Sequence, residues 1–172
     1  MFVIKNAKIS IKINKISLNS VIECLDKNNL VYKIKSNYII IESKYVFVIF
    51  KPKNCMIVHI NVTKIDSLSD INKVVDVLVH EILSNLQITV NKIVVDNITA
   101  VYQTNKIINI PEIIESKKDC FKISYNNEKF PGMFIKFSVG TLIIFYTGKI
   151  IAVGCKTISN LEYLFDQLNK LI

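Results

Sequence analysis

The pattern of apolar and polar positions predicts short strands and two longer helices, in an order that runs through the chain twice. The first half predicts strands at residues 2–13, 30–34, 38–42, 45–50 and 55–62, a short helix at 17–25 and a longer one at 70–86. The second half predicts strands at 88–103, 121–125, 133–137, 141–146 and 149–153, a short helix opened by Pro111 and a last helix running to Ile172. This repetition predicts two repeats, residues 1–87 and 88–172.

Residues 141–153 predict a hairpin that is apolar on both faces, with its turn at Thr147-Gly148. Alternation along the strands assigns each side chain to one face: Ile143, Phe145, Ile151 and Val153 to the first, and Leu142, Ile144 and Tyr146 to the second. An antiparallel sheet usually leaves one face polar. A second apolar face therefore predicts another covering layer or a bound ligand.

Both longer helices are amphipathic, with apolar residues at helical spacing. The last one carries Ser159-x-x-Glu162, which has the form of a capping box. Two such helices can cover only one face of a sheet built from both halves. The pattern therefore indicates an α+β fold, in which a curved antiparallel sheet carries the helices on its convex face and leaves its other face open.

The composition indicates a folded, basic protein. Of 172 residues, 51% are hydrophobic and 21% are charged, which is typical of a globular chain. The net charge of +8 is carried by lysine alone, because the sequence contains no arginine. This charge favours an anionic partner such as nucleic acid. The heavy use of Ile, Lys and Asn is typical of A·T-rich coding sequences, such as those of large DNA viruses and AT-rich eukaryotic parasites.

No enzyme centre, metal site or membrane span is predicted. The four cysteines have no CxxC spacing, which predicts reduced intracellular thiols: Cys24, Cys55, Cys120 and Cys155. Cys55 and His59 share one side of a predicted strand, but a structural zinc site needs four ligands. Glycine-rich phosphate loops and nucleophile elbows are missing, so we expect neither catalysis nor a cofactor. No apolar run approaches the ~18 residues of a membrane span.

Residues 124–156 resemble the C-terminal repeat of the TATA-binding protein family. The resemblance rests on an ordered set of motifs: Ser124-Tyr125, Glu128-x-Phe130-Pro131-Gly132, Lys136, Ile143-Ile144-Phe145-x-x-Gly148-Lys149 and Val153-Gly154-x-Lys156. It covers the whole chain in outline and is specific from about Asp96 onward. It implies a pseudo-symmetric, two-repeat saddle and a transcription initiation factor that binds and bends A·T-rich promoter DNA through the minor groove.

The resemblance also implies roles for residues of the second half. Phe130 and Phe145 correspond to the wedge pair that kinks DNA, and Pro131-Gly132 would shape the stirrup loop. Further DNA contacts are implied for an apolar floor of Ile143, Ile151 and Val153 and for a basic rim of Lys136, Lys149 and Lys156. The family's central asparagine corresponds to Asn97, with Thr99 as the accompanying floor residue. In the family this stirrup docks transcription factor IIB, which makes Glu128 and Pro131 the partner site.

The first half departs from the family pattern. It has no Phe-Pro-Gly, and Tyr38 stands about where the first wedge phenylalanine is expected, with Phe50 as the candidate for the second. Asn6 fits the central asparagine by its distance to the following helix. Asn61 replaces the glycine that Gly154 matches in the second half. The long helix of this half is acidic, whereas that of the family is strongly basic.

Three functions are compatible with the sequence. The first is a transcription initiation factor whose partners are A·T-rich double-stranded DNA, a transcription factor IIB-like protein and the RNA polymerase machinery, with no membrane involved. It would act in the nucleus, or in a cytoplasmic viral factory if the chain is viral. The second is an adaptor of the same fold that has lost DNA binding. The third is an accessory substrate-binding domain of a nucleic-acid enzyme.

Overall fold

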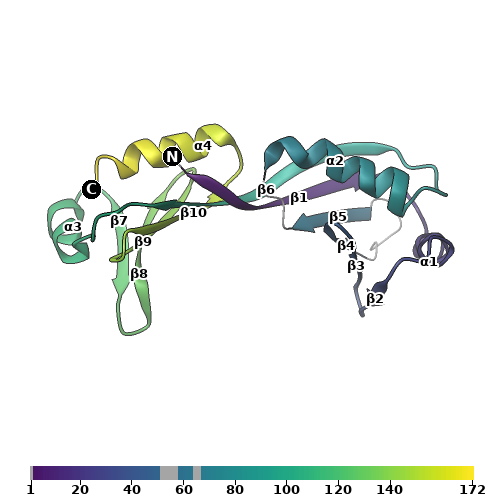
Figure 1. Cartoon of the computed structure of the whole chain (residues 1–172), viewed down its shortest axis with the longest axis horizontal. Coiled ribbons are helices and arrows are strands. Elements are labelled where there is room, and N and C mark those ends of the chain that lie inside the picture. The colour runs from purple at the N-terminus through teal and green to yellow at the C-terminus, as the bar shows by residue number, and fades with distance from the viewer. Residues whose placement is uncertain (1, 51–57, 64–66) are drawn as a thin grey trace. The chain divides into compact units, whose positions relative to one another are not determined.

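The computed structural model describes residues 2–50, 58–63 and 67–172, which form two compact units (Figure 1). The N-terminal unit contains Asn6–Val95, and the C-terminal unit contains Met1–Lys5 and Asp96–Ile172. The chain passes from one unit to the other within two long strands, β1 (Val3–Ile13) and β6 (Val90–Gln103). The expected division into repeats 1–87 and 88–172 was based on repetition in the sequence, whereas these two units are defined by compactness. The repeat boundary therefore stays a prediction.

The N-terminal unit contains an antiparallel sheet in the order β2-β3-β4-β5-β1. After β1, its elements are α1 (Leu18–Lys27), β2 (Tyr32–Ile34), β3 (Tyr38–Glu42), β4 (Val46–Phe50), β5 (Val58–Thr63), the 3₁₀ turn η1 (Leu68–Asp70), α2 (Ile71–Asp76) and the π-helical turn η2 (Val77–Ile82). The sequence predicted the fifth strand at 55–62, and residues 55–57 of that range lie outside the described part.

The helix predicted at residues 70–86 ends earlier in the structure. Its last turn closes with the N–H of Leu83 donating to the carbonyl oxygen of Leu78, 2.9 Å away. The side chain of Asn28, at the end of α1, donates its amide to the carbonyl oxygen of Ile82 (3.2 Å). This contact satisfies a carbonyl that a helix end leaves unpaired. The helix stops where α1 supplies that donor, which the helix's own sequence does not reveal.

The C-terminal unit contains an antiparallel sheet in the order β6-β10-β9-β8-β7. After β6, its elements are α3 (Ile110–Lys117), β7 (Lys122–Asn126), β8 (Phe130–Phe137), β9 (Gly140–Phe145), β10 (Lys149–Cys155) and α4 (Ile158–Leu168). The strands and helices of the second half thus occur in the predicted order, and α4 lies along β9 and β10 (Figure 1).

The capping box predicted at Ser159 is wrong. The helix α4 begins two residues earlier than that motif requires, and Thr157 is its N-cap. The Thr157 hydroxyl accepts a hydrogen bond from the N–H of Asn160, 3.2 Å away. Because β10 ends at Cys155, the chain must turn into the helix at once, and the first hydroxyl after the strand occupies the capping position.

One face of the C-terminal sheet forms the core of its unit. Side chains from four strands are buried on this face: Ala100, Met133, Ile135, Leu142, Ile144, Ile150 and Ala152. They pack beneath the apolar stripe of α4, which is formed by Leu161, Leu164 and Leu168. Phe2 adds to this side of the sheet, because its ring lies 5.8 Å from that of Phe165. Helix α4 therefore covers one face and leaves the other available.

Leu142 and Ile143 are neighbours on β9 that face opposite ways, and they allow a direct test of this layering. Leu142 is fully buried under α4, whereas Ile143 is only half-buried. We expect Leu142→Ala to lower the free energy of unfolding by about 2–5 kcal/mol, the usual cost of a core cavity. Ile143→Ala should cost clearly less, because its site is open to water on one side. Urea unfolding followed by circular dichroism measures both, and equal losses would contradict the layering.

Candidate nucleic-acid interface

The face of the C-terminal sheet opposite α4 is apolar and half-exposed, and we call it the open face. Cross-strand pairing brings its side chains into one continuous surface, because Ile143 lies beside Ile151 on one neighbouring strand and beside Phe134 on the other. The open face consists of Asn97, Thr99, Val101, Phe134, Thr141, Ile143, Phe145, Ile151 and Val153. All candidate floor residues of the second half are therefore gathered on one surface.

Three phenylalanines cluster at one end of the open face. The ring of Phe130 lies 5.6 Å from that of Phe145 in an edge-to-face arrangement and 5.2 Å from that of Phe134. Phe130 remains 39% exposed although it touches both partners. Aromatic rings in such geometry attract each other beyond their buried area. The contacts orient Phe130 and Phe145 while leaving ring surface accessible.

Gly132 makes room for this cluster. It pairs with Phe145 across the β8–β9 ladder. A Cβ atom built on Gly132 would lie 2.6 Å from Cε1 of Phe130 and 2.8 Å from Cγ2 of Ile143, closer than such atoms can approach. The rings therefore pack over bare backbone, and any larger residue at this position would push them away.

The prediction that Pro131-Gly132 shapes the stirrup loop is wrong. Both residues lie within β8, opposite a register irregularity in its pairing with β7. The loop itself is a tight turn held by Asn126, whose Oδ1 accepts hydrogen bonds from the N–H groups of Glu128 (3.1 Å) and Lys129 (3.3 Å). Proline lacks a backbone N–H, so it fits a strand only where the ladder is interrupted. Glu128 and Pro131 are both exposed, on the turn and beside it.

Asn97 is held in one orientation by the backbone of β10. Its Oδ1 accepts a hydrogen bond from the N–H of Gly154, 2.7 Å away, and its Nδ2 donates to Oγ1 of Thr99 at 3.3 Å. Gly154 adopts a φ of +84°, in a stretch where the β10–β6 register shifts. Because a backbone N–H can only donate, the oxygen of the Asn97 amide must face it. The second N–H of Nδ2 is left as a donor on the open face.

The candidate lysines lie at the ends of the strands. Lys136 stands next to the β8–β9 turn, where it pairs with Thr141 and Lys122. Lys149 begins β10 and Lys156 follows its end, so the three cations lie at opposite margins of the sheet. All three are exposed. The ion pairs of the described residues lie elsewhere, between Lys33 and Glu42 and between Lys73 and Asp70, so these lysines are available to an anion.

The N-terminal unit pairs its two candidate aromatic residues differently. Tyr38 lies directly across from Phe50, with ring centroids 5.8 Å apart, and Phe50 is 37% exposed. Tyr38 pairs with Phe50 in the same way that Gly132 pairs with Phe145 in the C-terminal unit. The position of Tyr38 therefore matches that of Gly132 and not that of Phe130. Asn6 is half-buried on β1 and alternates with the buried Ala7, so it lies on the face that the unit's core does not use.

Sequence reasoning missed several residues of these surfaces. In the C-terminal unit they are Val101, Gly132, Phe134 and Thr141, and in the N-terminal unit they are Lys8 and Lys12. Stepping back by two residues from Lys136 would have found Phe134, because period-two alternation keeps both on one face. The role of Gly132 depends on cross-strand packing, which alternation alone does not indicate.

The described residues show no alternative chemical centre. Among them, no group of three or more His, Cys, Asp or Glu side chains gathers as a metal site. Cys55, half of the Cys55 and His59 pair, lies outside the described part of the chain. No helix in that part is long and apolar enough to cross a membrane. Burial raises the pKa of Cys155 to about 11, so its sulfur is a protonated thiol at neutral pH.

The C-terminal unit thus presents an open sheet surface, with an apolar floor, exposed aromatic side chains at one end and cations at its margins. The candidate surface of this unit is thus the open side of a sheet rather than a cleft.

The family model described as "Transcription factor TFIID (or TATA-binding protein, TBP)" matches residues 92–172. The TATA-box-binding protein of Thermococcus celer is 29% identical over 83 residues, so the match spans 47% of this chain and less than half, 42%, of that relative. The structure of Methanococcus jannaschii TBP has the same fold, with a TM-score of 0.77 and 20% identity over 97% of this chain and 95% of that one. Residues 92–172 thus match the TATA-binding protein family, and the chain has the fold of a TATA-binding protein.

The likeness to the Methanococcus jannaschii structure confirms the α+β, TBP-like fold class with its antiparallel sheet. The matched model is described as a transcription factor and the relative as a TATA-box-binding protein, and neither description is that of an enzyme. The roles of individual residues are not addressed by these similarities and rest on the geometry of the open face.

Gly132→Ala tests how the aromatic cluster is built. The added methyl group would collide with the Phe130 ring and with Ile143, so we expect a loss of about 1–3 kcal/mol in the free energy of unfolding, as for other overpacked sites. In a Phe130→Ala background the same substitution should cost less, because one of the colliding groups is gone. Urea unfolding of the four proteins of this double-mutant cycle measures the difference. Equal costs in both backgrounds would contradict the packing of the ring over Gly132.

Proposed function

We propose that this chain is a TATA-binding-protein-like transcription initiation factor that binds and bends A·T-rich promoter DNA through the minor groove. The observation that carries the proposal is the open face, where an apolar floor, a pair of accessible phenylalanine rings and one oriented amide donor lie together. Each of these features corresponds to a requirement of minor-groove binding.

The apolar floor suits the minor groove of A·T-rich DNA. Ile143, Ile151 and Val153 form a surface without charged side chains, and sugar edges and the floor of a widened groove can pack against it. A guanine in the groove would place its exocyclic amino group against this surface, where it would find no acceptor among these side chains. The floor thus favours A·T pairs by exclusion.

Phe130 and Phe145 are placed to act as a wedge between base steps. Their rings are preorganised by contacts with each other and with Phe134, so little conformational freedom is lost when they insert. Unstacking a base step costs a few kcal/mol, and the bend it produces brings more DNA surface onto the protein. Flexible steps such as TA are the cheapest to open, which adds to the preference for TATA-like sequences.

Asn97 would read the groove directly. Its free Nδ2 hydrogen can donate to adenine N3 or thymine O2, which are acceptors at every A·T pair. Thr99 stands beside it, and its Oγ1 accepts the other Nδ2 hydrogen at 3.3 Å. Asn6 is the corresponding candidate in the N-terminal unit.

Lys136, Lys149 and Lys156 would meet phosphates along the margins of the open face. Lysine binds phosphate as a point charge, so this term depends on counterion release and weakens steeply with salt. In the N-terminal unit, Tyr38 and Phe50 would form the second aromatic contact. The two sequence repeats, residues 1–87 and 88–172, would each supply one such half-site.

The proposed partners beyond DNA are a transcription factor IIB-like protein and the RNA polymerase machinery. Glu128 and Pro131 would contribute to the first contact, because both are exposed at the turn between β7 and β8. The site of action would be the nucleus, or a viral factory in the cytoplasm if the chain is viral. Weak binding to DNA without base preference would instead support an adaptor that uses the open face for a partner protein.

Phe145→Ala tests the wedge. We expect fluorescence anisotropy to show tight binding to a TATA-containing duplex and weaker binding to a G·C-substituted one. Phe145→Ala should weaken TATA binding by about 1–3 kcal/mol, the usual cost of losing a good contact to a base. Tyr163→Ala is the matched control, because Tyr163 is a partly exposed aromatic residue of α4 on the other side of the sheet. Equal binding of both duplexes, lost as salt rises, would leave only lysine–phosphate attraction.

Asn97→Asp tests the amide donor separately from the fold. The carboxylate can still accept from the N–H of Gly154, so the bend in β10 is kept, but the donor to the groove is lost. We expect TATA binding to weaken by about 1–3 kcal/mol while thermal stability changes little. Asn160→Asp on α4 makes the same change of charge on the opposite side of the sheet. If both variants weaken DNA binding equally, charge alone explains the effect.

A further inference from the structure

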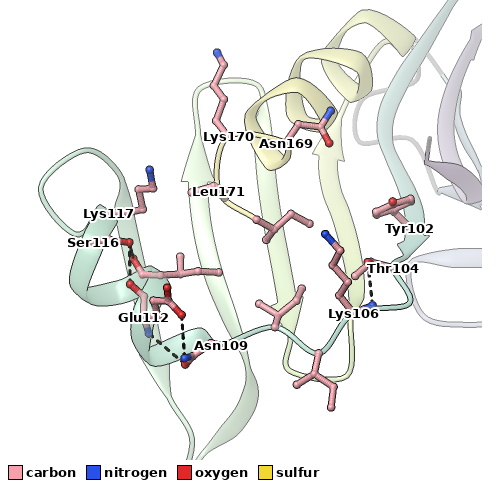
Figure 2. Close-up of a pocket in the computed structure, with 14 residues that line it drawn as sticks. Tyr102, Thr104, Lys106, Asn109, Glu112, Ser116, Lys117, Asn169, Lys170 and Leu171 are labelled. Atoms are coloured by element: carbon pink, nitrogen blue, oxygen red, sulfur yellow. Dashed lines mark hydrogen bonds between the residues drawn. The ribbon is translucent and has the colours of Figure 1, made fainter.

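A second surface of the C-terminal unit lies on the side of the sheet that carries α4. There the loop after β6, helix α3 and the residues after α4 enclose a hollow of about 630 Å³, which we call the helix-side pocket (Figure 2). Tyr102 fixes its position, because this residue pairs with the buried Ile150 and its ring lies 5.4 Å from that of Phe165 on α4. The pocket therefore lies away from the open face.

The pocket is lined by more positive than negative side chains. Lys106, Lys117 and Lys170 reach it from three separate segments, the loop, α3 and the turn after α4 (Figure 2). The ion pairs of the described residues do not include these lysines. Glu112 is the acidic side chain of the lining, and it accepts a hydrogen bond from Nδ2 of Asn109 at 3.0 Å. Two positive charges of the lining are thus in excess.

The loop that forms one wall is held in place by the β9–β10 turn. The N–H of Thr104 donates to the carbonyl oxygen of Gly148 (3.0 Å), and the N–H of Ile108 donates to that of Tyr146 (2.9 Å). Gly148 has a φ of +82°, and a Cβ atom there would lie 2.6 Å from the carbonyl oxygens of Thr104 and Lys106. The loop after β6 is therefore packed against the β9–β10 turn. The pocket is formed without a bound ligand.

Apolar side chains stand among the cations. Ile107 is 84% exposed and Ile172 is 49% exposed, and both line the pocket. Large apolar side chains exposed beside unpaired lysines fit a ligand that offers carboxylates and apolar groups together. DNA phosphates would satisfy the lysines but would leave the isoleucines in contact with charged backbone.

We propose that the helix-side pocket binds an acidic segment of a partner protein, in which Asp or Glu residues alternate with large apolar ones. The carboxylates pair with Lys106, Lys117 and Lys170, and the apolar side chains pack against Ile107. Because the pocket and the open face lie on opposite sides of the sheet, the segment binds whether or not DNA is present. The proposal therefore does not depend on DNA binding.

The test uses the full chain and a short fluorescein-labelled peptide in which Asp and Glu alternate with Leu and Phe. A second peptide carries Asn and Gln in place of the acidic residues. Lys106→Gln, Lys117→Gln and Lys170→Gln are compared with Lys118→Gln, which makes the same change of charge at an exposed residue outside the lining. We expect each pocket variant to weaken anisotropy-detected binding of the acidic peptide roughly two- to fivefold, and Lys118→Gln to leave it unchanged.

Three results would overturn the proposal. Equal weakening by Lys117→Gln and Lys118→Gln would mean that net charge alone attracts the peptide. Equal affinity for the acidic and the amide peptide would remove the role of the lysines. Displacement of the peptide by an unlabelled A·T-rich duplex would place it on the DNA surface. Retention of peptide binding by Phe145→Ala would support the pocket, and it separates this proposal from that of DNA binding.

Discussion

The structure depends on one constraint: the sheet of the C-terminal unit has two apolar faces and α4 can cover only one. Leu142 and Ile144 are buried beneath that helix, while Ile143 and Phe145 from the same strand remain half-exposed. Exposed apolar area costs free energy in proportion to its size, by about 25 cal/mol per Å². A protein that keeps such a surface contiguous, with cations at its margins, is shaped for a ligand that covers it.

Much of this could be predicted from the sequence, because period-two alternation assigns side chains to faces without knowledge of their neighbours. Leu142 and Ile143 were placed correctly for that reason, and the Phe-Pro-Gly segment with its following strands carries the resemblance to TATA-binding proteins. Features that depend on contacts between distant segments could not be predicted. Gly132 lies beneath two rings and Asn28 binds the helix end at Ile82, and both contacts join residues that are far apart in the sequence or on different strands. Thr157 becomes the N-cap because the chain turns into α4 directly after β10.

The two units have the same order of elements but different surfaces. Along β1, Lys8 and Lys12 alternate with buried isoleucines, so they project from the face that the core does not use. The corresponding side of β6 carries Thr99 and Val101. The opposing Tyr38 and Phe50 rings likewise replace an arrangement that depends on glycine in the other unit. The two units thus share a backbone pattern, and β1 carries lysines where the same side of β6 carries neutral residues.

The bond between Asn97 and Gly154 limits how this surface can evolve. An unrestrained amide can turn over and offer oxygen instead of nitrogen, which lets one asparagine serve donors or acceptors as needed. Asn97 cannot turn over, since its oxygen is bound to a backbone N–H in a conformation that glycine favours. Offering an acceptor instead of a donor at this position would therefore require a new backbone path in β10. At this position the surface therefore offers a hydrogen-bond donor to a ligand. Substitutions of the surrounding side chains leave that donor in place.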